Sequence, residues 1–223
     1  MKKTLILITI FLVSAAFSYY VVKNLSVKNS ENTAIERVVE TQEKNIEVIQ
    51  WDLYKTIYLA WGCFWCIEWA FDTKPGIISA VSWYAWGKAS TANYESITTG
   101  KTAHRETVKV TYNPTVLTKE DVLDTFFWYI DPYDTGWQFA DRGYQYTTAV
   151  FYMNEDEKQE ILDYINSHEF EDNLATKFVE IGSFYEAEEY HQDYAQKKSW
   201  NYERYFKGSG RKDYVNENKD KYK

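Results

Sequence analysis

The stretch TIYLAWGCFWCIEWAFDTKPGIISAVSWY, residues 56–84, carries the pattern that decides the fold. Its first residues predict a strand over 56–60, which Gly62 interrupts. Apolar residues at helical spacing then predict a helix over 64–71, which a Lys-Pro-Gly run ends. A second strand is expected over 77–84. The stretch therefore predicts a strand–turn–helix–strand unit with two cysteines at its first turn.

The segments downstream predict a second half of similar kind. Residues 107–112 alternate apolar and polar side chains, as a half-buried strand should. Thr118 and Asp121 have the spacing of a capping box, so a helix is expected over 118–130. A further strand is predicted over 144–153. The order β-α-β-β-α-β predicts an α+β fold of the ferredoxin-like, or split βαβ, type, in which two helices cover one face of an antiparallel sheet.

One domain is expected to hold this core. A chain of 223 residues with 45% hydrophobic residues can bury a single sizeable core. Three further elements are expected to follow it: a helix over 155–166, a strand over 177–181 and a Tyr-rich helical stretch over 186–197. The composition becomes polar from Lys207 onward and indicates a solvated end. We therefore expect a domain over 55–211 and a polar tail over 212–223.

The N-terminus has the pattern of an export segment. Lys2 and Lys3 precede an apolar run that continues to Val22. Its length is close to the roughly 20 residues that span a bilayer, so an uncleaved membrane anchor competes with a cleaved signal peptide over 1–23. A polar linker is expected over 24–54. Both alternatives place the domain outside the cytoplasm, anchored or secreted, with membrane contact through this segment only.

Charge and cysteine content exclude several classes of protein. The formal net charge of −8 argues against a nucleic-acid partner, because phosphate binding depends on clustered Lys and Arg. Two cysteines in 223 residues are too few for a disulfide-scaffolded secreted module. Because they lie three residues apart, at Cys63 and Cys66, they indicate chemistry before they indicate a structural bridge.

The position of Cys63 predicts the reactive sulfur. It precedes the predicted helix, where unpaired backbone N–H groups and the helix dipole stabilise a thiolate. Cys66 follows one turn later, and Cβ atoms about 5–6 Å apart must approach to about 3.5–4.5 Å for a disulfide. A purely structural disulfide is the alternative, although so short a loop stabilises little. A zinc site lacks the spacing, because the three histidines form no H-x₃₋₅-H pair.

Several motifs together resemble the A-type peptide methionine sulfoxide reductases, in the subgroup that reads GCFWC. The resemblance covers about residues 55–211. Separate motifs in the same order are far more specific than any one of them. The matching segments are GCFWC (62–66) with Glu68, NYE (93–95), GKTAHRE (100–106), IDP (130–132), QFADRG (138–143), QY (145–146) and AEEYHQDY (187–194).

The resemblance implies a set of catalytic roles. Cys63 is implied as the nucleophile that removes oxygen from methionine sulfoxide. Tyr94 and Tyr146 match two tyrosines that donate hydrogen bonds to the sulfoxide oxygen, and Glu106 matches a proton donor. Asp141 matches a residue that supports this network. Such groups suit a weakly electrophilic sulfoxide, whose oxygen must be protonated or strongly hydrogen-bonded as the S–O bond breaks. An apolar site would keep Glu106 protonated near neutral pH.

The resemblance also implies a substrate pocket and a recycling route. Phe64 and Trp65 are implied as the apolar pocket for the sulfoxide methyl, with the S epimer in oxidised proteins, or free methionine sulfoxide, as substrate. Attack leaves Cys63 as a sulfenic acid, with which Cys66 condenses to a disulfide. A thioredoxin-like thiol donor then reduces this disulfide, and no bound cofactor or metal is expected. The implied role is repair of oxidised proteins.

The sequence departs from the family pattern at four tryptophans. Trp61, Trp83, Trp86 and Trp137 stand where the family usually has glycine, and the chain holds as many tryptophans as glycines, 9 of each. Glycine serves where backbone passes close or takes a positive φ, so we expect clash or strain at these sites. Our hypothesis is that a codon meaning glycine in the source was read as tryptophan. No cysteine follows Cys66, so the C-terminal resolving cysteines of other members are absent.

Two other classes of protein fit parts of the sequence. A Cys-Phe-Trp-Cys run at a helix start is also typical of a thioredoxin-like thiol–disulfide oxidoreductase. That class has a different fold, with a proline before a strand that faces the cysteines, and only Pro75 precedes a predicted strand, at the far end of the cysteine helix. A tethered binding module without chemistry would keep its function after Cys63→Ser. Turnover that disappears in this variant therefore separates an enzyme from a binding module.

Overall fold

The computed structural model describes residues 53–218 and residue 221. These residues belong to one unit, which begins at Leu53. The predicted leader, and all but the last two residues of the predicted linker, lie outside the described residues. Across the described part of the chain, no helix has both the length and the apolar character needed to cross a membrane.

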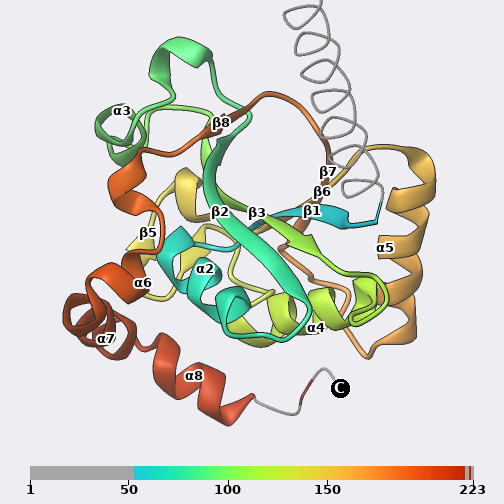
Figure 1. Cartoon of the computed structure of the whole chain (residues 1–223). Helices are drawn as coiled ribbons and strands as arrows, with labels where there is room; N and C mark the ends of the chain where they lie inside the picture. The colour runs from blue at the N-terminus through green and yellow to red at the C-terminus, as the bar shows by residue number, and fades with distance from the viewer. Residues whose placement is uncertain (1–52, 219–220, 222–223) are drawn as a thin grey trace, which may run out of the picture. The chain divides into compact units, whose positions relative to one another are not determined.

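The core has the predicted order of elements. Four strands lie side by side in the order β6-β1-β3-β2, and neighbours in this group are antiparallel. The core elements are β1 (Lys55–Ala60), α2 (Phe64–Asp72), β2 (Ile77–Ala85), β3 (Arg105–Tyr112), α4 (Lys119–Tyr129) and β6 (Ala149–Tyr152) (Figure 1). The capping box is present at the start of α4, where Thr118 and Asp121 exchange backbone and side-chain hydrogen bonds. The ferredoxin-like prediction is therefore confirmed.

Two strands extend this core at its edges. The predicted strand near 177–181 is β7 (Lys177–Glu180), and it pairs with β6 in parallel. An unpredicted strand, β8 (Phe184–Glu186), pairs with β2 in antiparallel fashion. The sheet therefore has six strands in the order β7-β6-β1-β3-β2-β8, and it is mixed instead of purely antiparallel.

Shorter elements carry the loops around the sheet. They are the 3₁₀ turns at Ala89–Thr91, Tyr144–Tyr146 and Glu189–His191, the helices α3 (Tyr94–Thr98), α5 (Glu155–Ser167) and α6 (Tyr194–Lys197), and the small pair β4 (Trp137–Gln138) and β5 (Asp141–Arg142). The strand predicted over 144–153 is wrong in its first part, because Gly143 takes a φ of 128° and a 3₁₀ turn follows. The helix predicted over 186–197 is likewise broken, since Asp193 adopts the left-handed conformation before α6.

The C-terminal part is helical and packed. Helices α7 (Ser199–Gly208) and α8 (Arg211–Glu217) occupy the region where a solvated end was expected from Lys207 onward. Arg211 is fully buried, and Val215 is buried as well. The indole N–H of Trp128 on α4 donates to the carbonyl of Val215 at 2.7 Å. The solvated-end prediction is therefore wrong for one face of α8, where Arg211 and Val215 are buried, whereas Asp213 and Glu217 on the same helix are exposed.

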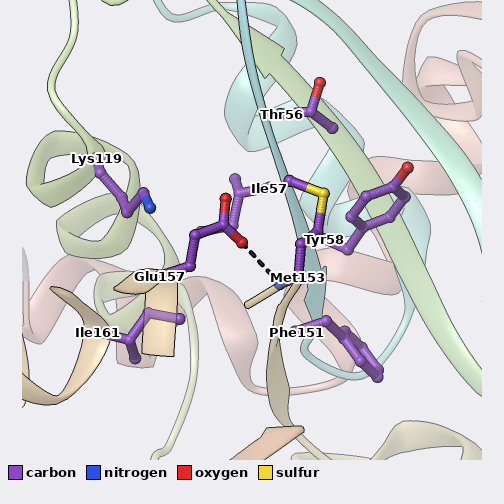
Figure 2. Close-up of a pocket in the computed structure, with 8 residues that line it drawn as sticks. All are labelled: Thr56, Ile57, Tyr58, Lys119, Phe151, Met153, Glu157 and Ile161. Atoms are coloured by element: carbon purple, nitrogen blue, oxygen red, sulfur yellow. Dashed lines mark hydrogen bonds between the residues drawn. The ribbon is translucent and has the colours of Figure 1, made fainter. Parts of the chain in front are cut away.

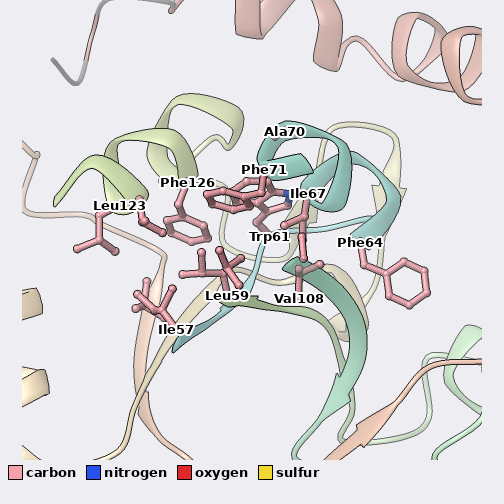
Figure 3. Close-up of a cluster of buried hydrophobic side chains, with 14 of the residues drawn as sticks. Ile57, Leu59, Trp61, Phe64, Ile67, Ala70, Phe71, Val108, Leu123 and Phe126 are labelled. Carbon is pink, nitrogen blue, oxygen red and sulfur yellow. The ribbon is translucent and has the colours of Figure 1, made fainter. Parts of the chain in front are cut away.

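The hydrophobic core lies between the sheet and two helices. Figure 3 shows side chains of α2 and α4 above those of β1 and β3, with Trp61 among them. The Trp61 side chain is fully buried, and its ring stacks on Phe71 and Phe126 at centroid distances of 5.4 and 5.3 Å. Such ring pairs stabilise a core beyond the area they bury. The clash expected at Trp61 is therefore absent, and the indole fills the layer behind the cysteine turn.

Strain appears at one of the four tryptophans. Trp86 has a φ of 74°, whereas Trp61, Trp83 and Trp137 do not have positive φ values. A left-handed backbone costs a bulky residue of this kind about 1–2 kcal/mol relative to glycine. The Trp86 indole lies against Gly182 and donates to the carbonyl of Glu180 at 3.1 Å. The expectation of strain is therefore confirmed at Trp86 alone.

Candidate active site

One cavity of about 120 Å³ gathers the predicted site residues from five places in the chain. The turn after β1 and the start of α2 supply residues 63–65, and α3, β3, β5 and the 3₁₀ turn at Tyr144–Tyr146 supply one residue each. The helix over 199–208 adds one more residue. The lining residues are Cys63, Phe64, Trp65, Tyr94, Glu106, Asp141, Tyr146 and Tyr205. Seven of these eight were predicted from sequence. Cys66 is the one predicted residue that does not line the cavity, because it lies fully buried behind it.

A second hollow is too small for a ligand. It is shown in Figure 2, and its volume is about 10 Å³, room for a single water. The residues around it are Thr56, Ile57, Tyr58, Lys119, Phe151, Met153, Glu157 and Ile161. No nucleophile and acid face each other there, so the cavity at Cys63 is the candidate active site.

Gly62 determines how Cys63 enters the cavity. Its φ is 96°, and a Cβ atom there would lie 2.8 Å from both the Gln138 Cβ and the Arg211 Nη2. A residue with a side chain would therefore be strained and would collide with two buried side chains. The turn allows Cys63 to occupy the N-cap of α2 with extended backbone angles, as the sequence predicts.

Burial dominates the electrostatics of Cys63. The side chain is only 5% exposed, and burial raises the pKa of its thiol well above the ordinary value. The neighbouring Cys66 thiol and the Asp141 carboxylate raise it further, while a hydrogen bond with Tyr205 lowers it. Burial therefore outweighs the thiolate stabilisation that is expected from the helix N-terminus. The resting thiol is protonated, because desolvation outweighs the helix dipole.

Glu106 is a neutral acid held against the nucleophile turn. Burial raises the pKa of its carboxyl well above the ordinary value, and proximity to Cys63 raises it further. The backbone N–H of Phe64 donates to Glu106 Oε2 at 3.1 Å and only partly offsets this effect. The expectation of a protonated carboxylic acid near neutral pH is therefore supported, and its O–H can donate into the cavity.

Two phenols complete the donor set. Burial and the nearby Glu106 raise the pKa of Tyr94 to about 12, and they raise the pKa of Tyr146 as well. Both hydroxyls therefore keep their protons at neutral pH and can donate hydrogen bonds. Tyr94 is further fixed through its backbone N–H, which donates to Glu188 Oε1 at 3.0 Å.

Tyr205 is a member of the site that sequence reasoning missed. Its hydroxyl donates to Asp141 Oδ2, and the same carboxylate oxygen lies 3.6 Å from Arg211 Nη2. Burial raises the pKa of Asp141, and these two neighbours oppose that effect. One of 20 tyrosines, in a segment of polar composition, gave no sequence signal of its own. Tyr202 and Phe206, at helical spacing on α7, are the sign of an inward face on this helix.

The aromatic wall is held from behind by a histidine. The Trp65 indole stacks on Tyr194 with centroids 3.8 Å apart and planes 10° apart. Its N–H donates to His191 Nδ1 at 3.1 Å. His191 therefore fixes the orientation of the Trp65 ring. The other site histidine of the motif, His104, accepts from the backbone N–H of Gly87 at 3.2 Å and holds a loop.

Cys66 is placed for reaction with Cys63. Both cysteines are free and buried, and the Cys66 backbone N–H donates to the Cys63 carbonyl at 3.1 Å. Among the described residues, no group of three or more His, Cys, Asp or Glu side chains could hold a metal ion. The chemistry available to the cavity is therefore that of a thiol beside proton donors.

Fold and cavity together define a thiol enzyme that can donate protons to an oxygen atom on its substrate. The family model of the peptide methionine sulfoxide reductases matches residues 55–223. The chain therefore belongs to the peptide methionine sulfoxide reductase family. It is an oxidoreductase that reduces methionine sulfoxide, a protein-repair activity, and enzymes of this family draw electrons from an external thiol reductant, thioredoxin.

Individual relatives agree with this assignment. The peptide methionine sulfoxide reductase MsrA of Bacillus licheniformis is 42% identical over 163 residues, which cover 70% of this chain and 88% of that protein. MsrA/MsrB of Vibrio cholerae is 39% identical over 168 residues, covering 74% of this chain, but the chain spans only 44% of that longer relative.

Solved structures show the same fold. Reduced Mxr1 from Saccharomyces cerevisiae superposes with a TM-score of 0.63 and 31% identity, covering 66% of this chain and 87% of that one. Methionine sulfoxide reductase A of Corynebacterium diphtheriae gives a TM-score of 0.57 and 26% identity, covering 66% of this chain and 76% of that one. The thioredoxin-like oxidoreductase alternative is not favoured.

Proposed function

We propose that the chain reduces the S epimer of methionine sulfoxide in proteins, with Cys63 as the nucleophile. The observation that carries this proposal is the single cavity in which a buried thiol, a buried carboxylic acid and two phenols meet. Its volume of about 120 Å³ suits the methylsulfinyl end of a side chain. Free methionine sulfoxide presents the same group and is a second candidate substrate.

The sulfoxide oxygen is bound by the three proton donors. Glu106, Tyr94 and Tyr146 all keep their protons at neutral pH, for the reasons given above. Donors aimed at an oxygen where negative charge develops stabilise the transition state more than the ground state. Glu106 is the general acid, and the phenols orient the oxygen and share its charge.

The methyl group is bound by the aromatic wall. Phe64 is fully buried and lies 6.3 Å, centroid to centroid, from the Trp65 ring. Because His191 and Tyr194 lock the Trp65 ring, the wall is rigid before substrate arrives. With the oxygen fixed on one side and the methyl on the other, only one sulfur configuration presents its sulfur to Cys63.

The first step moves one oxygen atom and two electrons. Cys63 sulfur attacks the sulfoxide sulfur while Glu106 donates a proton to the oxygen. The oxygen ends on Cys63, the substrate sulfur gains the electron pair, and methionine leaves. The proton of the resting Cys63 thiol replaces the one that Glu106 has given. The products are Cys63 sulfenic acid and methionine, and Glu106 is again neutral.

The second step restores the cysteine. Cys66 sulfur attacks the Cys63 sulfenic acid, an S–S bond forms, the S–O bond breaks, and water leaves. An external dithiol of the thioredoxin type then reduces the disulfide by thiol exchange. This order is supported by the burial of Cys66, which does not line the cavity, whereas Cys63 does.

We also propose that the domain acts outside the cytoplasm. The apolar run after Lys2 and Lys3 supports export, either as a cleaved signal or as an anchor. Fractionation of cells that express the full chain, with the N-terminal residue of the mature protein determined, separates the two alternatives.

The test uses both resolved epimers of a methionine sulfoxide peptide with dithiothreitol. Wild type is expected to reduce the S epimer only, and Cys63→Ser to reduce neither. Cys66→Ser should keep turnover with dithiothreitol, because a small thiol can reduce the sulfenic acid directly, and should lose it with thioredoxin. Glu106→Gln should lose about 10²–10⁴-fold in kcat/KM. Turnover of the R epimer, or full activity in Cys63→Ser, would contradict the proposal.

A further inference from the structure

The buried cation nearest to the cysteines comes from the far end of the described chain. Arg211 begins α8, and none of its side chain is exposed. Its Nη1 donates to the carbonyl of Trp61 at 3.4 Å and to the carbonyl of Tyr129 at 3.1 Å. The guanidinium carbon lies 4.5 Å above the ring of Phe139. These contacts fix the charge directly beneath the turn that carries Cys63.

Two of its nitrogens remain without hydrogen bonds. Among the described residues, Arg211 Nε and Nη2 have no hydrogen-bond partner. The closest carboxylate oxygen, Asp141 Oδ2, lies 3.6 Å from Nη2 and already accepts from Tyr205. A buried cation without full hydrogen bonding is costly unless an anion stabilises it. Asp141 supplies one anion for this cation, and the hydrogen-bonding positions of Nε and Nη2 remain open to a second anion that forms during the reaction.

The turn leaves room for this cation. Arg211 Nη2 lies only 2.8 Å from the place where a Cβ of residue 62 would stand. Gly62 therefore permits the guanidinium to approach the backbone between β1 and α2. The same turn presents Cys63 at the N-cap and Cys66 one turn later.

The groups that face Cys66 are neutral apart from Arg211. They are Cys63 from the same turn, Tyr129 from α4, Tyr202 and Tyr205 from α7, and Arg211 from α8. Burial raises the pKa of all three tyrosines, so their hydroxyls keep their protons. Asp141 is the anion that faces Cys63. Of the described groups that face Cys66, Arg211 is thus the one cation.

We propose that Arg211 is a positioning residue for the resolving step, and that its guanidinium stabilises the Cys66 thiolate that attacks the Cys63 sulfenic acid. The proposal rests on the function proposed above. The attack needs an anionic sulfur, and Cys66 has no exposed surface, so water cannot stabilise that charge and a nearby cation can. In this step the S–S bond forms, the S–O bond breaks, and hydroxide leaves and takes the proton released by Cys66 to give water.

The experiment separates the two chemical steps. Reduced wild type, Arg211→Met, Arg211→Lys and Cys66→Ser are mixed with the S epimer peptide without reductant. Quenched samples are analysed for released methionine, for Cys63 sulfenic acid trapped with dimedone, and for free thiols. Cys66→Ser serves as the matched control, because it must release methionine and accumulate sulfenic acid.

Arg211→Met also loses the ion pair with Asp141, so methionine release is measured separately and is expected to slow less than disulfide formation. This variant should form the disulfide about tenfold more slowly at pH 7, since one unit of thiol pKa changes the thiolate fraction tenfold. Raising the pH should restore the rate, and Arg211→Lys, which keeps a charge but not the planar fork, should be intermediate. Disulfide formation at the wild-type rate and with the wild-type pH profile in folded Arg211→Met overturns the proposal. A defect confined to methionine release also overturns the proposal. It would show that the Arg211 guanidinium acts through Asp141 and not on Cys66.

A second measurement covers the case in which Arg211→Met does not fold. The ultraviolet absorbance of the Cys66 thiolate is followed against pH in the Cys63→Ser variant. The same titration is repeated in Cys63→Ser/Arg211→Lys. The variant Cys63→Ser/Cys66→Ser, which has no cysteine, is the blank. A higher titration midpoint with Arg211→Lys supports the proposal, and equal midpoints overturn it. Failure of wild type to release one equivalent of methionine contradicts the proposed function itself and is distinguished by that readout.

Discussion

The indole N–H of Trp65 donates to Nδ1 of His191 at 3.1 Å, although the two residues lie 126 positions apart. Burial lowers the pKa of His191 to about 4, so the imidazole is neutral and its Nδ1 is an acceptor throughout the neutral range. This one bond joins the motif around the nucleophile to the AEEYHQDY segment. It explains why a histidine in that segment serves the substrate pocket without touching the reacting atoms.

Replacing His191 is expected to loosen the pocket. His191→Phe removes the acceptor and should raise KM for the sulfoxide peptide about 5–10-fold, since a hydrogen bond contributes about 1 kcal/mol. The value of kcat should change less than about threefold, because the proton donors stay in place. His168→Phe, on a histidine near Tyr164 and away from the cavity, is the matched control and should leave both constants unchanged. A kcat defect larger than the KM defect would refute the assignment.

The buried carboxyl of Glu68 should make the folded protein less stable as the pH rises. Burial raises its pKa to about 8, the backbone near Asp193 partly opposes this, and the Asp72 and Asp193 carboxylates add to the rise. The folded protein thus binds a proton that the unfolded chain loses near pH 4.5, and stability falls as pH rises between these values. The slope is at most about 1.4 kcal/mol per pH unit.

Glu68→Gln should remove this dependence. Its melting temperature should match wild type near pH 5 and exceed it near pH 8, as measured by thermal unfolding at both values. Glu95→Gln, at an exposed helix position, is the control. A melting-temperature difference that does not grow from pH 5 to pH 8 would show that the Glu68 carboxyl is not held neutral.

Tyr205 and Tyr202 differ in one testable respect. The Tyr205 hydroxyl donates to Asp141, whereas the buried Tyr202 hydroxyl has no hydrogen-bond partner among the described residues. Tyr205→Phe should lower kcat about tenfold, because Asp141 loses a charge-assisted hydrogen bond of about 1.5–3 kcal/mol. Tyr202→Phe should keep activity within about twofold. Equal effects in steady-state assays with dithiothreitol would count against a role for Tyr205.

The strained backbone at Trp86 gives a direct comparison. Trp86→Gly should be more stable than Trp86→Ala by about 1 kcal/mol in denaturant unfolding, because only glycine adopts a φ of 74° without cost. At Trp137, which has no positive φ, the order should reverse. If Trp86→Ala is more stable than Trp86→Gly, residue 86 does not have a left-handed backbone. Mass spectrometry of the native protein tests the codon hypothesis itself, which tryptophan at these positions would refute.

Local patterns in the sequence predicted much of the core. The alternation in β3 and the capping box at Thr118 act over a few residues, so the chain reveals them without knowledge of contacts. The motif order placed seven of the eight cavity residues correctly. The rise of the Cys63 pKa was not predicted, because helix position is a local property and burial depends on what covers the turn.

The C-terminal helices could not be predicted in the same way. Residues 207–218 are mostly polar, and polarity is a reliable sign of exposure except where a charge meets partners far away in sequence. Arg211 is such a case, because its carbonyl partners lie 150 and 82 positions earlier. Tyr205 was missed for the same reason, because its place in the site depends on the hydrogen bond that its hydroxyl donates to Asp141. No local pattern contains that information.

The contact between Arg211 and Trp61 also has a consequence for biosynthesis. The segment with both cysteines is synthesised early, whereas α8 leaves the ribosome 150 residues later. A growing or truncated chain therefore contains both cysteines but lacks the contacts that Arg211 makes with the turn that carries them. The contacts of Arg211 with Trp61 and with Asp141 form only after the last helices have been synthesised.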